Sequence, residues 1–129
     1  MEEKELETKE LCAIIADSAK EVRKWFTPGY EENVYKNAMY LELRSRGLVV
    51  ETEVPFEVRY KNHVVGSYRA DMIVNRKVIV ELKSVNALAP IHSIQLVNYL
   101  TATGINEGML INFGSETIEI RHKDRIYQP

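Results

Sequence analysis

The stretch that decides the fold is Tyr68-Arg-Ala-Asp-Met-Ile-Val-Asn-Arg-Lys-Val-Ile-Val-Glu-Leu-Lys83. Apolar residues dominate both of its arms and the polar triplet Asn75-Arg76-Lys77 separates them, which is typical of two strands joined by a tight turn. A three-residue turn would place Asp71 opposite Glu81 on the same face of the sheet. A two-residue turn would pair Asp71 with Val80 and send the two carboxylates to opposite faces. We predict the three-residue register.

In that register Asp71, Ile73, Ile79, Glu81 and Lys83 share one side, because side chains alternate faces along a strand. Directly opposed carboxylates repel, and a shared proton, a cation such as Lys83 or a bound divalent metal could offset the repulsion. Two carboxylates and a lysine are the minimal set for metal-assisted phosphodiester hydrolysis. The alternative is an ordinary amphipathic hairpin with a solvated charged face, but the two isoleucines argue against a fully wetted face.

Length and composition indicate an ordinary globular protein. With 129 residues, we expect the whole chain, 1–129, to form a single domain. It has no apolar run long enough to span a membrane and no basic segment followed by an apolar one at its acidic start, so we expect a cytoplasmic protein with no membrane association. The single cysteine, Cys12, cannot form an internal disulfide and lacks the sequence partners of a zinc site, so a core position is expected.

The charge is unevenly distributed. The formal net charge is -2, and residues 1–10 carry five acidic side chains and two lysines, a net of -3, which leaves about +1 for the rest of the chain. A strong nucleic-acid binder normally carries a basic patch or stripe. The balance therefore argues against a high-affinity, non-specific duplex binder.

Hydrophobic periodicity and turn signals predict three helices and five strands in a mixed sheet with helices on its faces. Pro55 argues for an edge position or a bulge, Lys61-Asn62-His63 is expected to form a turn, and the basic tail at 121–125 is expected to be a solvated end. The expected helices are 2–26, 30–46 and 90–103, and the expected strands are 48–60, 64–74, 78–83, 108–113 and 117–121.

The order of these features resembles the PD-(D/E)XK nuclease superfamily. Its marks are Glu32 on a helix, Asp71 on a strand, Glu81-x-Lys83 on the next strand and Gln95-x-x-x-Tyr99 on the following helix. Within the superfamily, Gly29-Tyr-Glu-Glu32-Asn-Val-Tyr35 resembles the signature of the bacterial family named for Gly-x-x-Glu-x-x-Tyr, and the segments 78–83 and 110–113 are also similar to it. The resemblance extends from about Leu11 to Arg121. Ala70 stands where the superfamily motif has proline, a common departure.

The resemblance implies an α/β protein with an α+β mixed sheet, built as a restriction-endonuclease-like αβββαβ core with an extra N-terminal helix. It also implies a Mg²⁺ or Mn²⁺ ion, a choice with which oxygen-only ligands agree. Its implied ligands are Asp71, Glu81, the Leu82 carbonyl and Glu32, the last directly or through water. Lys83 would orient or activate the attacking water and stabilise phosphate charge. Gln95 and Tyr99 would position Lys83 or the substrate strand, and Tyr35 and His92 are further candidates for substrate contact.

The function implied is metal-dependent hydrolysis of phosphodiester bonds in nucleic acid, with DNA as the expected substrate and RNA left open. The alternative is a non-catalytic nucleic-acid-binding or protein-interaction module that retains the nuclease fold, since the superfamily includes proteins that have lost catalysis. The intact charged set favours the enzyme, and the nearly neutral charge favours the alternative. A chain this short would need a homodimer or a partner protein for substrate specificity.

Overall fold

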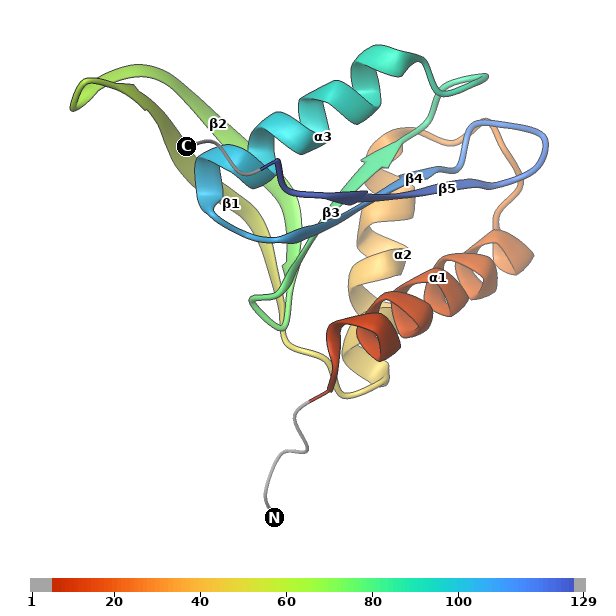
Figure 1. Ribbon diagram of the computed structural model, residues 1–129. Helices are drawn as coiled ribbons and strands as arrows, with labels where there is room; N and C mark the ends of the chain where they lie inside the picture. Colours follow the sequence, from red (N-terminus) through yellow and green to blue (C-terminus); the bar gives the residue numbers. More distant parts are fainter. Residues whose placement is uncertain (1–5, 127–129) are drawn as a thin grey trace.

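A five-stranded mixed sheet runs through the centre of the computed structural model, which describes residues 6–126 (Figure 1). Helices α1 and α2 cover one face of the sheet, and α3 covers the other. The elements in chain order are α1 (Thr8–Trp25), α2 (Glu32–Ser45), β1 (Val50–Tyr60), β2 (His63–Val74), β3 (Val78–Lys83), α3 (Pro90–Thr103), β4 (Glu107–Asn112) and β5 (Glu119–Asp124).

The strands lie in the order β1-β2-β3-β4-β5. Strands β3 and β4 are parallel and are joined through α3, whereas the other neighbouring pairs are antiparallel. The run from α2 to β4 is thus the predicted αβββαβ core, preceded by α1 and completed by β5 as an added antiparallel edge. The predicted fold class is confirmed.

The two faces of the sheet have separate apolar cores. One core joins buried residues of α1 and α2, such as Leu11 and Met39, to Met72 and Val80 of the sheet. The other joins α3 to the opposite face, including Ile79. The alternation of side chains along β2 and β3 makes both cores possible, because neighbouring residues supply opposite faces.

Strand β4 approaches α3 closely at Gly108. A Cβ at this position would lie 2.9 Å from Leu96 Cδ1 of α3. Glycine therefore sets the separation between helix and sheet behind the predicted site.

The predicted three-residue register of the central hairpin is confirmed. Val74 pairs with Val78, and the two preceding positions of β2 pair in the same register with β3. In the turn, Asn75 and Arg76 adopt left-handed backbone conformations with φ of 50° and 56°, and the Lys77 N–H donates to the Val74 carbonyl at 3.0 Å. Asparagine tolerates this conformation better than most residues, so the turn suits its sequence.

The β1-β2 hairpin forms a long arm that extends beyond α3 (Figure 1). As predicted from Pro55, β1 is an edge strand. The expected turn at Lys61-Asn62-His63 is wrong by one residue, because Tyr60 pairs with His63 and His63 begins β2. Lys61 and Asn62 have φ of 47° and 68°, which is the two-residue turn whose twist matches that of the strands.

Two elements differ from the expectation by more than two residues at one end. Helix α1 begins at Thr8 rather than at residue 2, and residues 2–5 lie outside the described part of the chain. The last strand is Glu119–Asp124 rather than 117–121, so the basic segment expected as a solvated end pairs with β4 as far as Asp124. Backbone pairing with an otherwise open strand edge outweighs the polarity of these side chains. Within residues 6–126, no helix combines the length and apolar character needed to cross a membrane.

Candidate metal centre

The candidate site lies where β2 and β3 separate. Their ladder of paired residues ends at Met72 and Val80. Beyond that point the Asp71 N–H donates to Glu81 Oε2 at 2.9 Å, and the Leu82 N–H donates to Asp71 Oδ2 at 2.9 Å. The two carboxyl groups thus take the place of backbone partners, and this holds both of them in the gap between the strands.

Strand β1 is irregular at the same level. Its pairing with β2 includes Thr52 with Met72 and Val54 with Ala70, while the intervening Glu53 has a φ of 49°. A positive φ at a glutamate is uncommon and costs backbone energy unless its surroundings hold it. The two strands that flank Asp71, β1 and β3, therefore both depart from regular pairing with β2 beside the carboxyl pair.

Glu81 is the buried member of the carboxyl pair. Glu81 is 7% exposed, and burial, the charge of Asp71 and a side-chain hydrogen bond with Asp71 together raise the pKa of Glu81 to about 9. Near neutral pH, without a cation, Glu81 therefore carries a proton that it shares with Asp71. Two inward-facing carboxyl groups that need a positive charge between them fit a hard divalent cation.

Glu32 and Lys83 lie beside this pair. Glu32 is the first residue of α2, and its pKa is raised by burial and then by the charge of Asp71, while the charges of Lys83 and Lys36 act in the opposite direction. Lys83 is the last residue of β3, and its charge also opposes the rise in the pKa of Glu81. The structure thus brings the four charged residues predicted for the site into one electrostatic neighbourhood.

A cleft of about 860 Å³ separates the β1-β2 arm from α3. Gln95 and Tyr99 line it, and the Gln95 amide donates to the Tyr99 hydroxyl at 3.2 Å. The pKa of Tyr99 is raised by burial and then by the charge of Glu81, so the charge of the carboxyl pair acts on this side of the cleft. Tyr68 of the arm packs against Tyr99 with ring centroids 5.5 Å apart. The full lining is Glu57, Val58, Arg59, Tyr68, Ile91, His92, Ile94, Gln95, Asn98, Tyr99, Thr101 and Ala102.

Comparison with known proteins agrees with this architecture. The family model described as the PD-(D/E)XK nuclease superfamily matches residues 9–124. The chain belongs to this superfamily. No curated protein matches it. Among solved structures, one titled "Crystal structure of SSO0001" is similar in fold, with a TM-score of 0.60 and 20% sequence identity over 74% of this chain and 50% of that one. The chain therefore spans about half the length of that neighbour, and the likeness concerns the fold alone.

One residue of this candidate site is not predicted from the sequence: Lys36 joins Asp71 to Glu53, the irregular residue of β1. Its Nζ lies 2.5 Å from Glu53 Oε1 and 3.3 Å from Asp71 Oδ1, with 14% of its side chain exposed. Burial lowers the pKa of Lys36, but the hydrogen bond to Glu53 and the charge of Asp71 more than offset this and leave the pKa raised. The available signal was the spacing of Glu32 and Lys36, which places them on one face of the helix.

The predicted role of Tyr35 in substrate contact is wrong. Its side chain is fully buried, its hydroxyl donates to the Thr27 carbonyl at 2.6 Å, and its ring stacks on Phe113 with centroids 4.8 Å apart. Tyr35 thus fixes the segment between α1 and α2 to the core, where no substrate reaches it.

His92 and Leu82 have local structural roles as well. His92 lines the cleft, and its Nδ1 accepts the Ala89 N–H at 3.0 Å, which caps the start of α3. Leu82 directs its side chain into the core shared with α1 and α2 while Asp71 holds its N–H.

Proposed function

We propose that this chain is a metal-dependent nuclease of the Gly-x-x-Glu-x-x-Tyr family that hydrolyses phosphodiester bonds, with DNA as its substrate. The observation that carries the proposal is the buried Asp71–Glu81 pair. Each carboxyl group accepts a backbone N–H of the opposite strand, and the pair holds a proton in place of a cation. Placing two carboxyl groups together away from water is unfavourable for a hairpin with a purely structural role, whereas a metal site requires such a pair.

In this proposal Mg²⁺ or Mn²⁺ binds to Asp71, Glu81 and the Leu82 carbonyl, with Glu32 acting through water. When bound, such an ion supplies Lewis-acid polarisation of the phosphate and a more acidic water. The oxygen-only donor set suits these hard cations. Lys36 holds the Asp71 carboxylate from the helix side, so that the acid is oriented before the ion arrives.

Lys83 lies two residues after Glu81 on β3, and its charge acts on the carboxyl pair. Its ammonium group orients the attacking water by hydrogen bonding and stabilises the charge that develops on the phosphate oxygens. Gln95 and Tyr99, joined by their hydrogen bond, position the scissile strand at the inner end of the cleft. The aromatic surface of Tyr68 offers a face on which a base can stack.

The non-catalytic alternative has an observation of its own. Val64 and Val65 near the tip of the arm are 47% and 63% exposed, and the net charge of the chain is -2. Exposed apolar side chains on a projecting hairpin suit a protein partner or a second copy better than they suit a phosphate backbone. A retained fold that serves only as an interaction module would account for both.

Cleavage assays separate the two functions. Purified protein is incubated with single- and double-stranded DNA and RNA in Mg²⁺, Mn²⁺ or EDTA, and Asp71→Asn is compared with the exposed loop variant Glu116→Gln. The nuclease proposal expects metal-dependent cleavage by the wild type and by Glu116→Gln, and none by Asp71→Asn. Binding of nucleic acid without cleavage under every condition would support the interaction module instead.

A further inference from the structure

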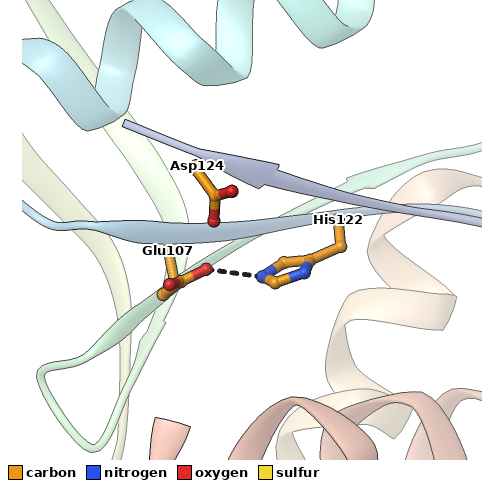
Figure 2. A group of neighbouring side chains, drawn as sticks. All are labelled: Glu107, His122 and Asp124. Carbon is orange, nitrogen blue, oxygen red and sulfur yellow. Dashed lines mark hydrogen bonds and ion pairs between the residues drawn. The ribbon is translucent and has the colours of Figure 1, made fainter. Parts of the chain in front are cut away.

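A second cluster of metal-ligating side chains lies on β4 and β5, outside the candidate nuclease site. Within residues 6–126, Glu107, His122 and Asp124 each offer one ligand atom, and these atoms all lie within 4.8 Å of one another (Figure 2). Glu107 begins β4 and pairs directly with Asp124 at the end of β5. His122 and Asp124 are two residues apart on one strand and therefore project from the same face.

This cluster is on the other side of the sheet from the carboxyl pair. Glu107 lies opposite Val78 at the start of β3, whereas Glu81 lies opposite Leu110 farther along the same parallel pair. Met109, which shares the face of Glu107, belongs to the core under α1 and α2. Glu81 shares the face of Ile79, which belongs to the core under α3. An ion in one cluster would therefore not occupy the other.

Tertiary packing also gives Cys12 a partner that its sequence surroundings did not indicate. Cys12 lies on α1, and its Sγ is 3.8 Å from His122 Nε2. Burial and then the charges of Glu107 and Asp124 raise the pKa of the Cys12 thiol to about 11. A sulfur donor of α1 thus lies beside the imidazole that Glu107 and Asp124 of β4 and β5 surround.

The arrangement also carries an electrostatic conflict. Glu107 and Asp124 are directly opposed on neighbouring strands, where like charges are unfavourable. Burial and the hydrogen bond with Asp124 raise the pKa of Glu107, although the hydrogen bond and charge of His122 oppose this rise. His122 Nε2 lies 2.6 Å from Glu107 Oε2 (Figure 2), and its side chain is 50% exposed. The half-open side of the cluster leaves a path by which a cation can enter.

We propose that Glu107, His122 and Asp124 bind a Zn²⁺ ion, with the Cys12 thiolate as its fourth ligand. Imidazole, carboxylate and thiolate are the donors that zinc takes in proteins, whereas Mg²⁺ and Mn²⁺ favour sites built from oxygen. The ion would replace the proton between His122 and Glu107, with a small shift of the carboxylate. It would tie the end of β5 and the first turns of α1 to β4, and so act as a structural clip apart from catalysis.

The test uses the full chain carrying Asp71→Asn, which weakens the nuclease metal site and leaves the second cluster intact. Zn²⁺ titration by calorimetry should give one site, and Zn²⁺ should raise the melting temperature. Adding His122→Ala should weaken binding at least 100-fold and remove the rise. His63→Ala on the arm is the matched control and should change neither measurement. Circular dichroism checks that each variant is folded.

Cobalt substitution tests the thiolate separately. Co²⁺ bound by the same protein should show a thiolate-to-metal charge-transfer band that Cys12→Ser removes, together with a loss of at least tenfold in Zn²⁺ affinity. Absence of Zn²⁺ binding to the Asp71→Asn protein, or binding that survives His122→Ala, would overturn the site. A Cys12→Ser protein with unchanged affinity and spectrum would overturn the assignment of its fourth ligand. None of these readouts depends on cleavage, so failure here is distinct from failure of the proposed nuclease.

Discussion

Replacing Glu81 with glutamine should make the stability of the metal-free protein much less dependent on pH. Glutamine imitates the protonated acid, because its carbonyl oxygen can still accept the Asp71 N–H and its amide can donate to the Asp71 carboxylate. In the wild type, burial and the charge of Asp71 raise the pKa of Glu81 to about 9. In the unfolded chain a glutamate has a pKa of about 4.3.

The sign and size of the effect follow from proton linkage. Between these two values the folded protein holds a proton that the unfolded chain has lost, so stability is fully present below the lower pKa and is lost as pH rises toward the upper one. Each pH unit in this window costs about 1.4 kcal/mol. From pH 6 to pH 8 the wild type should therefore lose about 3 kcal/mol relative to Glu81→Gln, or about 10 °C in melting temperature for a domain of this size.

The assay is urea denaturation in EDTA at pH 6, 7 and 8 of the wild type, Glu81→Gln and the exposed-loop control Glu116→Gln. The difference in unfolding free energy between the wild type and Glu81→Gln should shift by about 3 kcal/mol across the series, while the control should stay parallel to the wild type. Parallel curves for the wild type and Glu81→Gln would refute the claim that a buried, protonated acid sits between β2 and β3.

Other substitutions test separate parts of the molecule. Under the nuclease proposal, Lys83→Ala should lower single-turnover cleavage in Mn²⁺ by about 10²-fold while calorimetric Mn²⁺ binding survives; cleavage at the wild-type rate would remove Lys83 from the mechanism. Tyr35→Phe removes the hydrogen bond to Thr27 and should lower the free energy of unfolding in denaturant by about 1 kcal/mol. The affinity for nucleic acid should stay unchanged, whereas it would fall if Tyr35 contacted the substrate. Gly114→Ala would place a Cβ 2.4 Å from the Val85 backbone nitrogen. Its melting temperature should therefore fall by an amount equivalent to a loss of about 1–3 kcal/mol or more in unfolding free energy. An unchanged melting temperature would contradict the close packing of these two loops.

The sequence by itself determined the local geometry of the central hairpin and of α3. The polar triplet at 75–77 between two apolar arms sets the register of β2 and β3, and this register by itself brings Asp71 near Glu81. Pro90 and Gly104 set the bounds of α3, because proline suits the first turn of a helix and Gly104 ends it with a left-handed φ of 76°. These features depend on residues close together in the chain, where periodicity and turn chemistry are decisive.

Only the tertiary structure decided which faces meet. Lys36 reaches Glu53 because α2 packs beside the irregular part of β1. The spacing of charges along the helix indicates only that Lys36 shares a face with Glu32. Tyr35 matches a family signature, but the stacking on Phe113 makes it a core residue. Cys12 and His122 are 110 positions apart and still lie within 3.8 Å. Periodicity shows which side of an element is buried, but the partner it meets depends on packing of the whole chain.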